Sequence, residues 1–133
     1  MAHWLMKSEP GTYSWDQLVR DRKTEWDGVR NPTARLHLKA MQKGDECFFY
    51  HSGDERQVVG IMRVTREARP DPKDPAWVSV EVEAVRPVEP PVTLKAIKAE
   101  AGLARMELVR LSRLSVSPVR DEEWARVLEM AKG

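Results

Sequence analysis

The feature that most constrains the fold is a strict alternation of valines with polar residues within residues 77–85. The alternating residues are Val78, Ser79, Val80, Glu81, Val82 and Glu83. Successive side chains of a β-strand point to opposite faces, so this period of two predicts a strand with one buried and one solvated face. Residues 46–51 and 57–65 are also strand-like and flank a turn at residues 52–54. We therefore predict an antiparallel sheet with one wet face.

Helix signals are interspersed among these strands. Ser14-Trp15-Asp16-Gln17 has the capping-box form and predicts a helix through about residue 20. Asn31-Pro32 combines an N-cap with a proline at the first helical position and predicts a helix that ends at Gly44. Thr93 predicts the start of a short helix, and Asp121 the start of a last, amphipathic one.

The remaining segments are expected to be short strands and loops. Residues 3–6 and 111–117 are strand-like, whereas residues 21–28 and the proline-rich residues 70–75 and 87–91 are expected to be loops. This order of elements predicts a mixed α+β fold, a small and partly closed antiparallel β-barrel decorated by several short helices.

Length and composition limit the class of protein. A length of 133 residues is typical of one domain, so residues 1–133 are expected to form a single domain. Cys47 is the one cysteine, which excludes an intrachain disulfide and favours a reducing compartment. The chain has no run of about 18 apolar residues and no secretion signal, so we expect a cytoplasmic, nucleoid-accessible monomer without a membrane partner.

The net charge of +1 neither indicates nor excludes a nucleic-acid partner. Residues 30–43 and 105–120 are locally basic and are either a binding surface or ordinary solvated arginines.

Three segments place aromatic or apolar residues beside polar ones: Lys7-Ser8-Glu9, Trp26 to Asn31, and Tyr50-His51-Ser52. A pocket for a planar heterocycle needs this mixture, because aromatic faces stack on the ring while fixed donors and acceptors read its edge. Trp26, expected in an exposed loop, either stacks on a ligand or plugs the barrel. Asn31 either reads a base edge or caps a helix, and the segment 7–9 is either a pocket wall or a solvated strand end.

Motifs of catalysis and cofactor binding are absent from the sequence. His51 and Ser52 are neighbours in an expected strand and point to opposite faces, and no G-x-S-x-G elbow is present. The histidines lack metal-ligand spacing, and no G-x-G-x-x-G or Walker motif occurs. We therefore expect a protein that is not an enzyme and holds neither a metal nor a cofactor.

Several separately spaced motifs along nearly the whole chain resemble the EVE domain family. They are Trp4-Leu5-Met6-Lys7-Ser8-Glu9-Pro10, Trp26-Asp27-Gly28-Val29-Arg30-Asn31 with Ala34-Arg35, Gly44-Asp45, Phe49-Tyr50-His51-Ser52, Glu67-Ala68-Arg69-Pro70-Asp71, and Arg113-Leu114-Ser115-Val116. The resemblance implies a PUA-like fold, related to the YTH domain, and a reader of modified bases. The implied ligands are modified cytosines in DNA, such as 5-methylcytosine and 5-hydroxymethylcytosine.

Carried over by motif, the resemblance implies a set of site residues. The base pocket would be formed by Lys7, Ser8, Glu9, Trp26, Val29, Asn31, Tyr50, His51, Ser52 and Ser115. The resemblance also places Arg113 at the rim, and we expect the phosphates beside the bound nucleotide to be contacted by Arg30, Arg35, Lys39 or Arg113.

This reading predicts that one nucleotide, flipped from a duplex or presented by a single strand, enters the pocket and stacks on Trp26. Two alternatives remain open at the level of sequence. One is a module for modified or structured RNA, which the 2′-hydroxyl would distinguish. The other is a module that binds a protein or a small metabolite and no nucleic acid.

Overall fold

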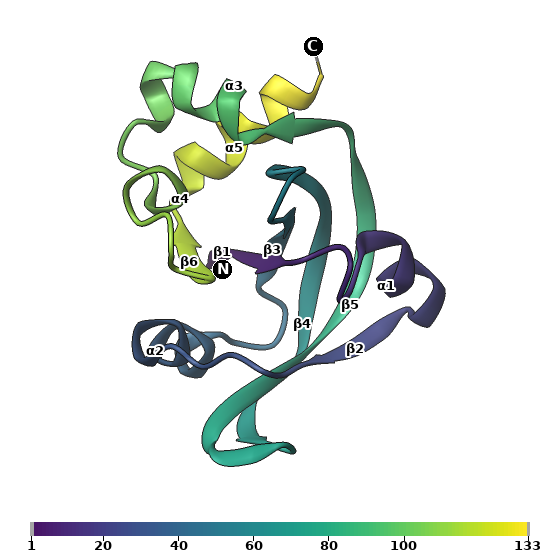
Figure 1. Cartoon of the computed structure of the whole chain (residues 1–133). Coiled ribbons are helices and arrows are strands. Elements are labelled where there is room, and N and C mark those ends of the chain that lie inside the picture. The colour runs from purple at the N-terminus through teal and green to yellow at the C-terminus, as the bar shows by residue number, and fades with distance from the viewer. Residues whose placement is uncertain (1, 133) are drawn as a thin grey trace.

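Within residues 2–132, which the computed structural model describes, six strands form one curved sheet in the order β2-β5-β4-β3-β1-β6 (Figure 1). The strands are β1 (His3–Ser8), β2 (Lys23–Trp26), β3 (Glu46–His51), β4 (Gln57–Asp71), β5 (Asp74–Thr93) and β6 (Val116–Val119). The helices are α1 (Trp15–Asp21), α2 (Pro32–Ala40), α3 (Leu94–Ala99), α4 (Glu107–Arg110) and α5 (Asp121–Ala131), with a 3-10 turn at Ala101–Leu103.

The mixed α+β class is confirmed, and the sheet is open, with β2 and β6 at its two edges. One ladder differs from the antiparallel expectation. β1 runs parallel to β3, whereas the other four ladders are antiparallel. Parallel neighbours need a long crossover connection, and α1, β2 and α2 supply it between β1 and β3.

Residues 70–75 and 87–91 were expected to be loops, and this expectation was wrong except for the turn at residues 72–73. They lie in the long β4–β5 hairpin, where Pro70 is paired with Val78 and Pro87 with Gly60. The β4–β5 register shifts at several points, including Pro70/Asp71 and Val58/Gly60. Such irregularities accommodate residues that cannot donate a ladder hydrogen bond, which explains how prolines occur inside these strands.

Three further boundaries differ from expectation. Residues 23–26, expected in a loop, form β2 by pairing with residues 80–83 of β5. The last strand is limited to residues 116–119, and its edge position tolerates Pro118. Helix α2 ends at Ala40, and Gly44 instead takes a positive φ of 98° in the turn before β3.

The helix starts that the sequence predicted are confirmed by their caps. Ser14 and Gln17 form a complete capping box, and the side chains of Asn31 and Thr93 accept hydrogen bonds from backbone N–H groups of α2 and α3. Within residues 2–132, no helix combines the length and apolar character needed to span a membrane.

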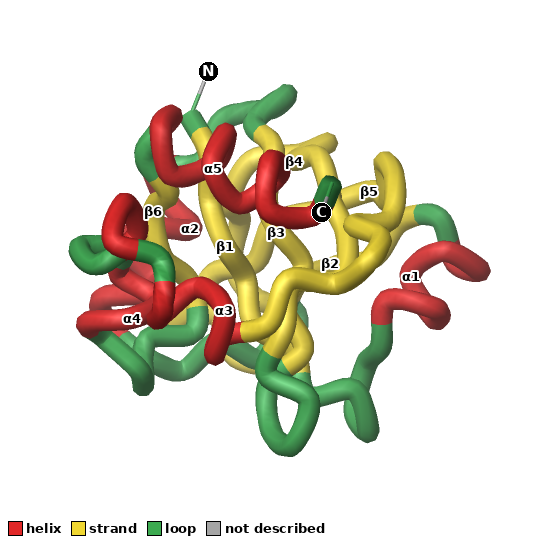
Figure 2. Tube along the Cα trace, turned by 90° about the horizontal axis from the view of Figure 1, so that it is seen from above, coloured by secondary structure: helices red, strands yellow, loops and turns green. Residues whose placement is uncertain are grey.

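Each face of the sheet carries its own hydrophobic cluster. Met6, Trp15, Trp26 and Phe49 belong to the cluster on one face. The cluster on the other face contains Leu5, Phe48 and Trp124, together with apolar residues of α3, α4 and α5. Figures 1 and 2 show these three helices gathered on one side of the strands, away from α1. We call the two sides the cavity face and the helix-covered face.

Candidate nucleic-acid interface

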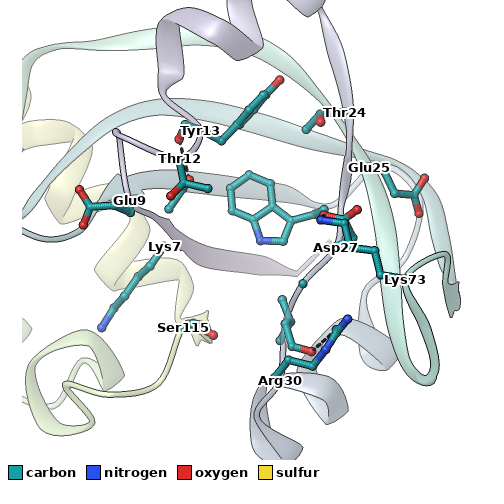
Figure 3. A pocket seen from close by; sticks show the side chains of 14 residues that line it. Lys7, Glu9, Thr12, Tyr13, Thr24, Glu25, Asp27, Arg30, Lys73 and Ser115 are labelled. Carbon is teal, nitrogen blue, oxygen red and sulfur yellow. Dashed lines mark hydrogen bonds and ion pairs between the residues drawn. The ribbon is translucent and has the colours of Figure 1, made fainter.

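A cavity of about 440 Å³ opens on the cavity face, between the end of β1, the loop before α1, β2 and the β2–α2 loop (Figure 3). This volume lies within the range of roughly 300–1,000 Å³ that is usual for ligand pockets. The lining residues are Lys7, Ser8, Glu9, Thr12, Tyr13, Thr24, Glu25, Trp26, Asp27, Gly28, Val29, Arg30, Lys73 and Ser115. Seven residues predicted for the site therefore line one cavity: Lys7, Ser8, Glu9, Trp26, Val29, Arg30 and Ser115.

Trp26 is the last residue of β2 and retains 8% of its surface accessible, so its expected placement in an exposed loop was wrong. Its ring meets Phe49 edge-on, with centroids 5.4 Å apart and planes at 85°. The indole therefore packs into the core and lines the cavity at the same time. Within residues 2–132 the indole N–H of Trp26 donates no hydrogen bond. The one side-chain nitrogen or oxygen there that is both fully buried and without a hydrogen bond is Arg35 Nε, so the indole nitrogen of Trp26 is not fully buried. The indole N–H of Trp26 therefore remains accessible to a ligand.

Asp71 holds the β2–α2 loop in place, a role that was not assigned to it from the sequence although it ends one of the motifs that resemble the EVE domain. Its carboxylate, buried at 2% exposure, accepts hydrogen bonds from Gly28 N at 2.9 Å, Arg30 Nη1 at 3.0 Å and Lys73 N at 2.7 Å. Burial alone would raise the pKa of Asp71, but these donors outweigh it and lower the pKa to about 2. One ionised carboxylate therefore ties the β2–α2 loop to the turn of the β4–β5 hairpin.

The wall formed by the end of β1 is held by hydrogen bonds to neighbouring loops. Lys7 Nζ donates to the Ser112 carbonyl at 2.8 Å, and burial lowers the pKa of this lysine. Ser8 Oγ donates to the Tyr13 carbonyl at 2.6 Å. Glu9 lies against Gly53, where φ is 76° and a Cβ atom would collide with the Glu9 carboxylate. The hydrogen bonds fix the side chains of Lys7 and Ser8 at the cavity, and Glu9 adds an exposed carboxylate beside them.

Glu25 belongs to the lining of the cavity, but its carboxylate points away from Trp26 and is held by residues outside that lining (Figure 3). Its carboxylate accepts two hydrogen bonds from Arg66, at 2.8 and 2.7 Å, and further ones from Arg69 and Ser79. The hydrogen bonds from Arg66 are the main cause that lowers the pKa of Glu25 to about 2. Because its partners lie on β4 and β5, Glu25 also fastens the edge strand β2 to the sheet.

Tyr50, His51 and Ser52 do not line the cavity. Tyr50 is buried in the cluster of the helix-covered face. His51 Nε2 accepts a hydrogen bond from Trp15 N at 3.0 Å, which places the ring proton on Nδ1, 2.8 Å from Glu55 Oε1. The backbone N–H of Ser52 donates to the Ser8 carbonyl at 2.9 Å. This segment therefore supports α1 and the end of β1 without lining the cavity.

The rim cations differ in how firmly they are held. Arg30 pairs with Asp71, and Arg35 lies over the Trp77 ring at 4.7 Å while it donates to the Ala76 carbonyl at 3.1 Å. Lys39 is exposed in the last turn of α2.

Asn31 and Arg113 line a second cavity, of about 380 Å³, together with Thr33, Leu111, Ser112 and Leu114. Asn31 Oδ1 accepts from Ala34 N at 2.9 Å, so the helix-capping alternative is realised.

The other cavity-lining residues were not selected from the sequence: Thr12, Tyr13, Thr24, Glu25, Asp27, Gly28 and Lys73. Asp27 and Gly28 lie inside the motif that begins at Trp26 and could have been included with it. The remaining five come from segments that only the fold brings together.

The EVE domain family matches residues 2–130. A protein from Rhodopseudomonas palustris, Rpa0253, is 48% identical, with a TM-score of 0.94 over 99% of this chain and 94% of its own. Human thymocyte nuclear protein 1 is 37% identical, over 97% of this chain and 73% of its own length. The crystal structure of human THYN1 in complex with 5-methylcytosine-containing DNA is 33% identical, with a TM-score of 0.93 over 100% of this chain and 99% of its own.

Proposed function

The chain belongs to the EVE domain family and has its PUA-like fold, and from this premise we propose that it binds a modified cytosine of DNA in the cavity beside Trp26. The observation that carries the proposal is the likeness over the full chain to a human protein captured with 5-methylcytosine-containing DNA. The cavity adds the physical argument, since it combines an aromatic wall with polar groups and has the volume of a small-molecule pocket.

The groups around the cavity suit a planar base. Trp26 offers a ring and an accessible N–H, and base stacking on an aromatic side chain contributes about 1–3 kcal/mol. Lys7 and Glu9 supply a donor and an acceptor, and the Ser115 hydroxyl can act as either. A base inside a duplex cannot reach such a cavity, so the nucleotide is flipped out or comes from a single strand.

We propose a binding module and not an enzyme. Catalysis of bond cleavage needs an activated nucleophile or an acid–base pair at the cavity. The thiol of Cys47 is buried, and burial raises its pKa, which opposes formation of the thiolate. His51 lies behind the wall, with both ring nitrogens engaged by Trp15 and Glu55. The groups that line the cavity are suited to holding a ring by hydrogen bonds and stacking.

The test is a titration of short, end-labelled single-stranded DNA carrying one 5-methylcytosine, one 5-hydroxymethylcytosine or plain cytosine, followed by fluorescence anisotropy. We expect wild type to prefer a modified strand. Trp26→Ala should weaken that binding by about 1–3 kcal/mol, which is roughly 5- to 150-fold in Kd. Trp124→Phe, on the helix-covered face, is the matched tryptophan control and should leave Kd unchanged.

Equal binding of all the strands, unaffected by Trp26→Ala, would contradict the proposal. RNA strands of the same sequence belong in the same experiment, because tighter binding of RNA would assign the cavity to an RNA ligand. Absence of binding to both nucleic acids would move the function to a protein or metabolite partner.

A further inference from the structure

The second cavity adjoins the first one. Consecutive residues of the β2–α2 loop divide between them, with Arg30 at the first cavity and Asn31 at the second. The segment before β6 does the same, with Leu114 at the second cavity and Ser115 at the first. Lys7 of the first cavity donates to the carbonyl of Ser112, which lines the second. The two cavities therefore share both walls.

The polar groups of the second cavity are unlike those of the first. Glu9, Glu25 and Asp27 line the first cavity, whereas no carboxylate lines the second within the described residues. The residues that line the second cavity include Arg113, Thr33 and Ser112, whose side chains carry a guanidinium and two hydroxyls. Arg113 is exposed, and within residues 2–132 it forms no ion pair.

Asn31 adds a donor to this set because of its capping role. Its Oδ1 is occupied by the N–H of Ala34, which orients the side chain. The amide nitrogen, Nδ2, has no recorded partner in the part of the chain that the structure describes, and Asn31 lines the second cavity. The cap therefore does not compete with binding, because capping uses the oxygen and leaves the two N–H donors free.

We propose that the second cavity binds a backbone phosphate next to the base held in the first cavity, through Asn31 Nδ2, Arg113 and the hydroxyls of Thr33 and Ser112. This assignment rests on the proposed function. A phosphate accepts hydrogen bonds and carries a negative charge, so it matches a cavity that offers donors and one free cation. A base edge mixes donors and acceptors and fits the first cavity better. Asn31 thereby positions the strand and does not read the base.

Asn31→Asp is the sharpest variant. An aspartate retains the oxygen that caps α2, so the helix start is preserved, but it replaces the two N–H donors by a negative charge. Lys95→Gln is the matched control, since it also lowers the net charge by one and since Lys95 is exposed on α3, outside both cavities. Arg113→Ala tests the cation separately. The probe is single-stranded DNA with one 5-methylcytosine, in which either linkage flanking that nucleotide is replaced by an uncharged methylphosphonate.

The expected result has three parts. Asn31→Asp and Arg113→Ala each raise Kd by about tenfold for modified and plain strands alike, as the loss of a hydrogen bond to a charged group does. Lys95→Gln leaves Kd within about twofold. One of the two methylphosphonates weakens binding to wild type by about tenfold and weakens binding to Asn31→Asp by much less, because the phosphate contact is already lost.

Two outcomes overturn the inference. One is a loss of discrimination between modified and plain cytosine in Asn31→Asp, which would make Asn31 a reader of the base. The other is full wild-type affinity for both methylphosphonate strands. Failure of the proposed function looks different: the strands would bind without regard to cytosine modification or to Trp26, whatever the second cavity does.

Discussion

The two faces of the sheet each set a tryptophan against one of two consecutive phenylalanines of β3, but the geometry differs. On the helix-covered face, Trp124 lies between two stacked rings, those of Phe48 and His3. The centroid of Trp124 is 3.9 Å from that of Phe48, with planes at 16°, and 4.3 Å from that of His3. On the cavity face, Trp26 meets Phe49 edge-on and lines an open cavity. Both tryptophans are similarly buried, at 7% and 8% exposure. Exposure alone therefore does not distinguish a core tryptophan from a candidate ligand contact.

The arrangement of the neighbouring rings makes the distinction. Parallel stacking from two sides occupies both faces of Trp124 and leaves no surface for a ligand. An edge-on contact uses less of the ring face of Trp26. Packing of a tryptophan on a β3 phenylalanine thus supports stability on one face of the sheet and leaves room for a ligand on the other.

The largest expected effect is on the free energy of unfolding, and it tests the contrast between Trp124 and Trp26. Trp124→Ala should lower the free energy of unfolding by about 3–5 kcal/mol, because it removes a ring packed on both sides. Trp26→Ala should cost clearly less, since part of its surroundings is already a cavity and fewer contacts are lost. Urea unfolding followed by circular dichroism measures both. An equal loss in the two variants would show that Trp26 is an ordinary core residue.

A smaller effect concerns how the stability of the protein depends on pH through Asp71, which supports the cavity face. The folded protein holds the pKa of Asp71 at about 2, below the ordinary 3.8, so the ionised form stabilises the fold above pH 4. This contribution is lost as the pH falls toward 2. Asp71→Asn should lower stability by about 1.5–3 kcal/mol at neutral pH and by progressively less in acid.

Hydrogen exchange locates this effect. Exchange at the amides of residues 27–30 should accelerate in Asp71→Asn at neutral pH, whereas exchange in α5 should change only by the global loss of stability. Equal acceleration of exchange in α5 and in the β2–α2 loop would contradict the expected difference between the two faces. A constant difference in stability between wild type and variant from neutral pH to pH 3 would refute the assigned linkage.

The smallest expected effect separates the rim cations. Lys39 is exposed on α2, and no ion pair involves it within residues 2–132, so Lys39→Ala should change stability by less than about 0.5 kcal/mol. Its effect on DNA affinity should appear only at low salt, because exposed charges are screened. Titrations at low and moderate salt measure this. A loss of affinity that persists at moderate salt would place Lys39 in direct contact with a phosphate.

The sequence by itself determined the local structure and the family. The caps at Ser14, Asn31 and Thr93, the alternation in β5 and the apolar stripe of α5 all depend on neighbours a few residues apart, so they could be predicted directly. The motifs that resemble the EVE domain selected seven residues that line one cavity. The prediction was wrong where long-range pairing prevails over local preference, as for the prolines of the β4–β5 hairpin and for the parallel β1–β3 ladder.

Only the tertiary structure decided how the candidate site residues are divided between the two cavities. Asp71 supports the cavity loop from 43 residues away in the sequence, and Lys73 and Ser115 reach the same cavity from other segments. Asn31 follows Arg30 in sequence but lines a different cavity, and Tyr50 faces the opposite side of the sheet from Phe49. The physical reason is that a motif specifies side chains and local geometry. The surface to which each side chain contributes depends on strand pairing and packing between distant segments.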